Sequence, residues 1–166
     1  MVKEKKFDFC TSCRKETSYK IIKKTVQKVI KDKSYEFKIA VAVCDECGKE
    51  MDIPGLFDLN IKSIDEQYRQ AEGLISIDDI QKIMDIYNIG KAPLSIALGF
   101  GKITITRYLS GQMPSKKYSD IIKKALSSPN YMIKLLNDNA EKMGETAYKK
   151  AIKAAEEIAG LFCVSD

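Results

Sequence analysis

Apolar and polar residues alternate along the second quarter of the chain, as they do in a strand with one buried face. The alternating apolar residues are Tyr35, Phe37, Ile39, Val41 and Val43, and the residues between them are Glu36, Lys38, Ala40 and Ala42. A stretch rich in β-branched residues, Thr25 to Ile30, predicts the partner strand, and residues 31–34 predict the turn between the two strands. The pattern therefore predicts a β-hairpin within residues 1–53.

From Pro54 and Gly55 onward the apolar residues recur at intervals of three and four, which is typical of helices. A connecting helix is expected from Ile61 to Gly73, and Ser76 is expected to cap the next helix. Further helices are predicted over residues 94–98, 102–109, 115–127, 129–137 and 145–159, with Gly160 ending the last. Their expected buried side chains are Ile77, Ile80, Met84, Tyr87, Leu94, Leu98, Ile105, Tyr108, Tyr118, Ile121, Ile122, Ala125, Met132, Leu135 and Leu136.

The last predicted helix has an apolar stripe of its own. It consists of Tyr148, Ala151, Ile152, Ala155, Ile158 and Phe162. Two placements stay open, because the stripe would serve equally well to pack on the preceding helices or to pair with a second subunit. Cys163 lies beyond the stripe and is expected to be a free thiol.

Two Cys-x-x-Cys pairs lie at the ends of the predicted hairpin. They are Cys10 with Cys13, and Cys44 with Cys47. Four such thiolates complete a closed tetrahedral zinc site with no position left for substrate, so one structural Zn²⁺ per chain is predicted. Two disulfides and a thioredoxin-like redox motif are the alternatives. The start of the chain lacks the apolar run of a secretory signal, which favours a cytoplasmic protein with reduced thiols.

Composition narrows the function classes. The 166 residues include no histidine, which excludes Ser-His, Cys-His and His-metal catalysis, and no glycine-rich phosphate loop is present, so an enzyme is not expected. No apolar run approaches the ~18 residues of a membrane span. Residues 76–137 carry nine Lys and Arg against four Asp and Glu and form the most basic segment, which suits a nucleic-acid partner.

The short helices over residues 94–98 and 102–109 are joined by Gly99-Phe100-Gly101, the pattern of a helix-turn-helix. The residues expected to face outward are Lys102, Ile103, Thr104, Thr106 and Arg107. A helical hairpin that serves only the core would explain the glycines but not this polar, basic cluster. DNA binding is therefore the favoured interpretation.

The order of these parts resembles the MqsA-type (YgiT-type) antitoxins, which join a four-cysteine zinc domain to a helix-turn-helix of the Xre class. The resemblance covers about residues 8–137 and rests on the cysteine pairs and on two stretches, Tyr68 to Ser76 and Leu98 to Tyr108. It implies a C-terminal domain that dimerises and represses its own operon at a palindromic operator. It also implies a zinc domain that sequesters a toxin, often an mRNA-cleaving ribonuclease.

Individual positions match the family to different degrees. Cys10, Cys13, Cys44 and Cys47 match its zinc ligands, and Arg107 matches its base-contacting arginine. Ile103 stands where the prototype has a base-contacting asparagine. Lys91 stands where many Xre domains have glutamine, and Leu109 replaces their common glutamate. The residues at positions 91 and 109 favour phosphate contact or different packing over the usual base readout, and Ile103 is expected to change the operator sequence that is read.

The sequence thus predicts an α+β protein in four parts. These are a zinc-binding hairpin domain (1–53), a connecting helix (54–75), an all-α helix-turn-helix domain (76–137) and a helical extension (138–166). The expected function is a zinc-containing, homodimeric DNA-binding repressor, the antitoxin of a toxin–antitoxin pair. A stand-alone transcription regulator and a zinc-ribbon adaptor for protein or RNA are the alternatives.

Overall fold

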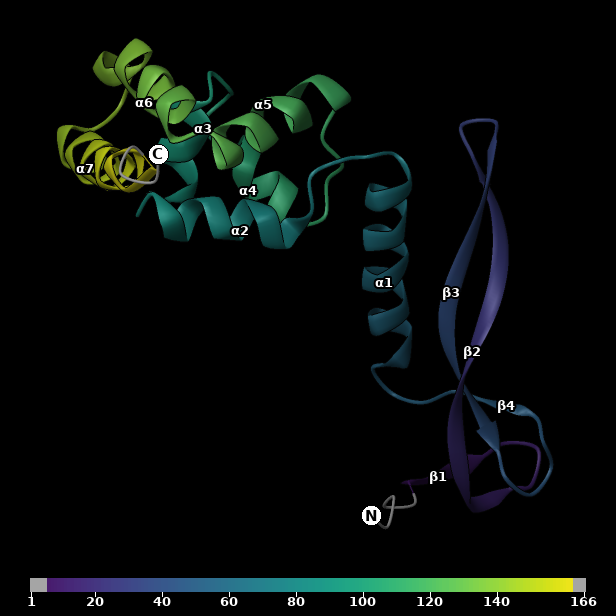
Figure 1. Cartoon of the computed structure of the whole chain (residues 1–166). Helices are drawn as coiled ribbons and strands as arrows, with labels where there is room; N and C mark the ends of the chain where they lie inside the picture. The colour runs from purple at the N-terminus through teal and green to yellow at the C-terminus, as the bar shows by residue number, and fades with distance from the viewer. Residues whose placement is uncertain (1–5, 163–166) are drawn as a thin grey trace. The chain divides into compact units, whose positions relative to one another are not determined.

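The computed structural model describes residues 6–162 and divides the chain into two compact units, Met1–Tyr68 and Arg69–Asp166. The chain is of mixed α/β class, with an antiparallel sheet followed by helices (Figure 1). The elements are β1 (Lys6–Cys10), β2 (Lys15–Ile30), β3 (Lys33–Cys44), β4 (Glu50–Met51), α1 (Leu56–Ala71), α2 (Ile77–Ile86), α3 (Lys91–Ala97), α4 (Thr104–Leu109), α5 (Lys116–Ser127), α6 (Pro129–Asp138) and α7 (Glu145–Phe162). None of the helices among these residues is long and apolar enough to cross a membrane.

The sheet has the order β1-β2-β3-β4 and is dominated by the β2–β3 hairpin. Twelve residue pairs join the two strands, from Tyr19 opposite Cys44 to Ile30 opposite Lys33. The predicted hairpin is confirmed, but β2 begins at Lys15 and not at Thr25, and the turn contains only Lys31 and Asp32. β1 and β4 pair only with the end of the hairpin that carries the cysteines.

The core of the first unit lies at two places along the hairpin. Tyr35 stacks on Phe37 with ring centroids 6.0 Å apart, and Tyr68 of α1 meets Tyr35 edge-on at 5.2 Å. At the other end Ala42 is buried together with Met51. The alternation had placed Ala42 on the polar face, but at this end the cysteines, Met51, Ile53 and Leu56 pack on that face and bury it.

Helix α1 is hydrogen-bonded to the free edge of β3 through two side-chain amides. The Asn60 side chain accepts from the N–H of Ala40 and donates to its carbonyl, both at 2.8 Å. The Gln67 side chain makes the same two contacts with Lys38, again at 2.8 Å. Because each amide supplies one donor and one acceptor, it replaces a residue of a neighbouring strand and satisfies the exposed backbone. The helix expected to be a connector is thus part of the first unit over most of its length.

Replacing Asn60 by Ala should loosen this attachment. We expect Asn60→Ala to cost about 0.5–1.5 kcal/mol, because the Ala40 backbone loses two hydrogen bonds while alanine favours the helix. Amide hydrogen exchange at Ala40 should accelerate several-fold, as NMR would show. Lys62→Ala, on an exposed position of the same helix, is the control and should leave that exchange rate unchanged. Equal exchange rates in both variants would contradict the proposed attachment.

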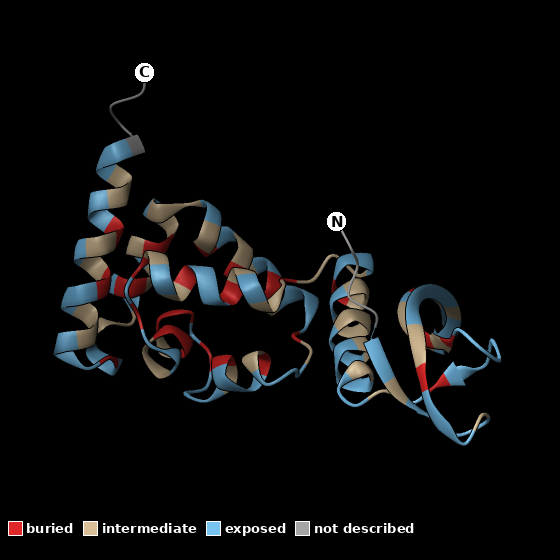
Figure 2. Ribbon diagram, turned by 90° about the horizontal axis from the view of Figure 1, so that it is seen from below, coloured by how far each residue is buried: buried red, intermediate tan, exposed pale blue. Residues whose placement is uncertain are grey.

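The helices of the second unit surround one hydrophobic core (Figure 2). The predicted cap of α2 is confirmed, since the Ser76 hydroxyl accepts from the N–H of Asp79 at 2.9 Å. Ile80 and Tyr87 are fully buried as predicted, and Ile83, which the predicted stripe omitted, is buried with them. The Tyr87 hydroxyl donates to the carbonyl of Ala125 at 2.9 Å, so α2 and α5 are also joined by a buried hydrogen bond.

The segment that leads into α2 is anchored by buried polar contacts. Arg69 is 1% exposed and donates to the carbonyls of Ile75 and Gln112. The buried Ser119 hydroxyl accepts from the N–H of Ile75 at 2.7 Å. A charged residue at position 69 gives no sequence signal for burial. Its guanidinium is accommodated because carbonyls accept its N–H groups.

Helix α7 packs its apolar stripe on the other helices of its own unit. Ala151 and Ala155 are fully buried in the common core, whereas Lys149 and Lys153 on the same helix are exposed. Of the two open placements for the stripe, the structure therefore shows packing on the preceding helices. The predicted end at Gly160 is wrong, because the helix continues through this exposed glycine, whose cost in a helix is only about 1 kcal/mol. The side chain of Phe162 and all of Cys163 lie outside the described residues.

Candidate functional site

The two cysteine pairs converge at one end of the sheet. Cys10 ends β1 and Cys44 ends β3, and Cys13 and Cys47 lie in the turns that follow these strands. All four Sγ atoms lie within 4.8 Å of one another. Residues separated by more than thirty positions in sequence thus form one four-sulfur group that could hold a metal ion.

The distances between the sulfur atoms fit a tetrahedral ion. The Sγ atoms of Cys10 and Cys47 are 3.7 Å apart, and those of Cys13 and Cys44 are 3.9 Å apart. Metal–sulfur bonds of about 2.3 Å in a tetrahedron put the sulfur atoms roughly 3.8 Å from one another. A disulfide would need about 2.05 Å, and all four thiols are free. The geometry therefore fits the predicted metal ligands and not the disulfide alternative.

Each cysteine pair is followed by a residue with left-handed backbone. Arg14 after Cys13 has φ 55°, and Gly48 after Cys47 has φ 70°. In both turns this residue donates its N–H to the carbonyl of the first cysteine, at 2.8 Å for Arg14 and 3.0 Å for Gly48. The two turns thus repeat one local structure, in which the chain reverses tightly enough for both sulfurs of a pair to face the same point.

The surroundings of the sulfurs favour a thiolate at one position. The Thr17 hydroxyl lies 3.2 Å from the Cys44 sulfur, and both residues are buried. Hydrogen bonds from this hydroxyl and from the Cys47 N–H lower the pKa of Cys44 to about 6. Hydrogen bonding to Cys47 and burial raise the pKa of Cys13 to about 12, so this thiol keeps its proton in the metal-free protein. Binding a divalent metal must therefore displace a proton from Cys13.

The residues predicted to face DNA lie on the surface of the second unit. Lys91 is exposed at the start of α3, and Ile103, in the turn before α4, is 54% exposed. Lys102, Thr106 and Arg107 are exposed as well, and Thr104 is half-buried. Helix α4 begins at Thr104, so Lys102 and Ile103 belong to the turn and not to the helix as predicted.

The inner side of the same segment is held by a buried hydroxyl. Ser95 of α3 donates to the carbonyl of Lys91 at 2.9 Å and accepts from the N–H of Ile105 at 3.0 Å. Ile105 and Tyr108 are buried, as predicted, along with Leu94 and Leu98 of the preceding segment. Because the first N–H groups of a helix have no partner within it, the Ser95 hydroxyl both satisfies one and fixes α4 against α3.

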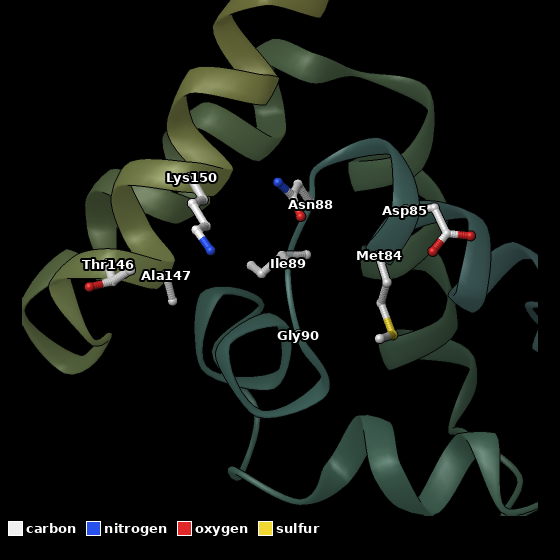
Figure 3. Close-up of a pocket in the computed structure, with 8 residues that line it drawn as sticks. All are labelled: Met84, Asp85, Asn88, Ile89, Gly90, Thr146, Ala147 and Lys150. Atoms are coloured by element: carbon white, nitrogen blue, oxygen red, sulfur yellow. The ribbon is translucent and has the colours of Figure 1, made fainter.

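A hollow of about 670 Å³ lies elsewhere on the second unit, between the end of α2 and the first turn of α7 (Figure 3). Its lining mixes apolar Met84 and Ile89 with polar groups, and the Lys150 ammonium points into it beside Asn88 (Figure 3). The hollow is separate from the cysteine group, and its residues were not predicted as a site. Its lining includes Gly90, which directly precedes α3.

Sequence reasoning missed three residues that shape these sites, namely Arg14, Thr17 and Ser95. The left-handed backbone at Arg14 could have been predicted, because Arg14 follows Cys13 in the same way as Gly48 follows Cys47. Thr17 and Ser95 gave no signal, since their roles depend on contacts with Cys44 and Ile105 across the fold.

Two comparisons with known proteins bear on the chain as a whole. A scan against protein-family models and a search of curated proteins both found no match. Any assignment of function therefore rests on the residues and geometry described above.

Removing the Thr17 hydroxyl should change metal binding in a pH-dependent way. Below pH about 6 the Cys44 sulfur of the metal-free protein is protonated, so Zn²⁺ must displace one more proton than at pH 7. Thr17→Val should raise the pKa of Cys44 and move this additional proton release to higher pH. Calorimetric titration with Zn²⁺ in buffers of different ionisation enthalpy measures the released protons.

Thr17→Ser retains a hydroxyl and is the matched control. Its proton release should follow that of the original protein across pH 5–8, whereas that of Thr17→Val should not. If the serine and valine variants released the same number of protons at every pH, the hydroxyl would have no role in ionising Cys44.

Proposed function

We propose that the protein is a zinc-containing, sequence-specific DNA-binding repressor that serves as the antitoxin of a toxin–antitoxin pair. The observation that carries the DNA-binding part is the two-sided character of α4. Its inner residues Ile105 and Tyr108 are buried, while Thr106 and Arg107 are exposed beside the exposed turn residues Lys102 and Ile103. A short helix held rigidly from behind, with a polar and cationic outer side, is suited to reading a DNA groove.

The proposed metal is one structural Zn²⁺ bound by Cys10, Cys13, Cys44 and Cys47. Four thiolates in a tetrahedron are a ligand set that suits zinc, and they leave no coordination position open for a substrate. The metal would link the two cysteine turns and neutralise the charge of the thiolates. A catalytic role for the ion is not part of the proposal.

In this proposal α3 and α4 form a helix-turn-helix, with α4 in the major groove. The Ser95 hydroxyl supports it by fixing the start of α4. Arg107 would read a base, since a guanidinium pairs with both acceptors of a guanine edge. Ile103 presents an exposed apolar side chain where a thymine methyl could be contacted, and Lys91 and Lys102 would hold phosphates.

A homodimer on a palindromic operator completes the DNA-binding proposal. Two copies of such a unit would bind half-sites roughly 34 Å apart. The dimer would then make twice the few contacts that one short helix makes alone. The buried stripe of α7 is already occupied within its own unit, so the dimer contact would use another surface.

The antitoxin role rests on the family resemblance and is supported by the surface of the first unit. Of the ten large apolar side chains that are exposed in the described residues, eight lie in this unit. Phe7 and Phe9 on β1 and Phe57 on α1 are 63%, 53% and 74% exposed. Exposed aromatic residues in such number favour a protein partner, which we propose to be a toxin encoded by a neighbouring gene.

Two substitutions separate base reading from phosphate binding. Arg107→Ala should cost about 1–3 kcal/mol on the operator and relax the preference at one base pair. Lys102→Ala should weaken binding to every duplex and lower the salt dependence by about one unit. Binding titrations on the operator, recovered by sequencing of bound genomic fragments, and on random duplexes give both quantities. Equal losses for Arg107→Ala on operator and random DNA would refute its role as a base reader.

The antitoxin proposal predicts rescue of growth in co-expression. The full chain should suppress the toxicity of the neighbouring gene product, and a Phe7→Ser/Phe9→Ser variant should suppress it less while binding the operator normally. An Arg107→Ala variant should still rescue growth when expressed from an independent promoter. Absence of any toxic neighbouring product would leave a stand-alone DNA-binding regulator as the function.

A further inference from the structure

The β2–β3 hairpin extends far beyond the rest of its sheet. β1 pairs only with Lys15 to Tyr19 of β2, and β4 pairs only with Ala42 and Val43 of β3. Twelve paired residues are separated by eleven steps of about 3.3 Å, so the two-stranded ribbon is roughly 36 Å long, close to the ~34 Å of one turn of DNA. A two-stranded β-ribbon is also one of the few elements that fit into the major groove.

The ribbon is strongly basic along its free part. Residues 20–38 contain seven lysines and only two acidic residues, Asp32 and Glu36. All seven lysines, namely Lys20, Lys23, Lys24, Lys28, Lys31, Lys33 and Lys38, are exposed. Lys24 is paired with Glu50, whereas Lys28 and Lys31 have no carboxylate partner among the described residues. The register puts Lys20, Lys24, Lys28 and Lys33 on one face of the ribbon and Lys23 and Lys38 on the other. Ammonium groups repeated in this way are suited to a polyanion whose charges repeat along its length.

The turn at the tip has a backbone that lysine disfavours. Lys31 and Asp32 form a two-residue loop and have φ 50° and 63°, as a type I′ turn requires of both central residues. Glycine and asparagine are the usual residues at such positions, because a longer side chain is strained there. Because strained backbone is concentrated at functional sites, a lysine in this conformation at an exposed tip points to a function for its side chain.

Protection of an open strand edge explains part of this charge but not all of it. Lys20, Lys23 and Lys28 would discourage edge-to-edge aggregation, since β1 does not pair with β2 beyond Tyr19 and leaves that edge open. Lys31 is in the turn and not on the edge, so edge protection gives no reason for a lysine in left-handed backbone. Asparagine there would fold more easily and protect the edge equally well.

We propose that the tip of the ribbon, with Lys28 and Lys31, binds the phosphates of duplex DNA as a second, sequence-independent contact. This inference rests on the proposed DNA-binding function, and it adds a second DNA contact, which lies in the unit with the four cysteines. The ribbon contributes affinity and salt dependence, and α4 contributes the choice of sequence. An anionic membrane surface is the other polyanion with which the lysines would pair, and the test separates the two.

The test uses the full zinc-loaded chain and the substitution Lys31→Asn. Because asparagine tolerates left-handed backbone, this variant should unfold about 1–3 °C higher than the original protein. It should nevertheless bind random 40-base-pair duplexes about five- to tenfold more weakly at 0.1 M salt, with a salt slope lower by about one unit. Lys28→Gln combined with Lys31→Asn should lower the slope by about two.

Lys62→Gln combined with Lys153→Gln removes two charges, as the double ribbon variant does, but from α1 and α7. It is the control for both ribbon variants and should leave the affinity within twofold. If Lys31→Asn stabilised the protein and bound DNA like this control, the inference would be overturned and α4 would remain the DNA contact. If the ribbon variants lost only binding to phosphatidylserine vesicles, a membrane would replace DNA as the partner. If Arg107→Ala left the operator preference intact while the ribbon variants lost affinity, the role of α4 would fail and the ribbon contact would stand.

Discussion

The convergence of four sulfur atoms at one end of the hairpin is the contact on which the first unit depends. That unit buries few side chains, and most residues of its longest strand, β2, are exposed, so burial of apolar surface contributes little to its stability. Four thiolates so close together repel one another unless a cation lies between them. A bound metal would turn that repulsion into a cross-link between the two turns, with an apparent binding energy of about 10–16 kcal/mol for zinc in small domains.

A metal bound with that free energy would also offset strain in the backbone of this unit. Arg14, Lys31 and Asp32 are all non-glycine residues with left-handed φ, each of which costs roughly 1–2 kcal/mol. Arg14 is in a cysteine turn, where the strain serves the metal geometry directly. Lys31 and Asp32 are at the far tip, which the paired strands connect to the cysteine end. A bound metal would therefore help this small unit to sustain a strained ribbon that its own core would hold poorly.

The parts of the structure that local pattern determines were predictable from the sequence. Alternation of apolar residues predicts the hairpin, and helical period predicts the buried side of α4. The Ser76 cap follows from capping chemistry, and the cysteine group follows from the spacing of the two pairs. The longer β2 was missed because Lys20, Ile21, Ile22 and Lys23 do not alternate, and this stretch has no buried face that would impose alternation. The amide contacts of Asn60 and Gln67, the burial of Arg69 and the hydroxyls of Thr17 and Ser95 depend on partners distant in sequence, which no local pattern encodes.

These non-local polar contacts follow one physical rule. At four places a side chain from another element supplies a partner to a backbone group that its own element leaves unpaired: Asn60 and Gln67 at the edge of β3, Ser95 at the start of α4, and Ser119 before α2. No buried side-chain nitrogen or oxygen in the described residues lacks a partner. In the proposed DNA-binding role, the fixed positions of Lys102, Ile103, Thr106 and Arg107 would therefore depend on hydrogen bonds at the ends of short elements. Apolar packing then holds those elements together from behind.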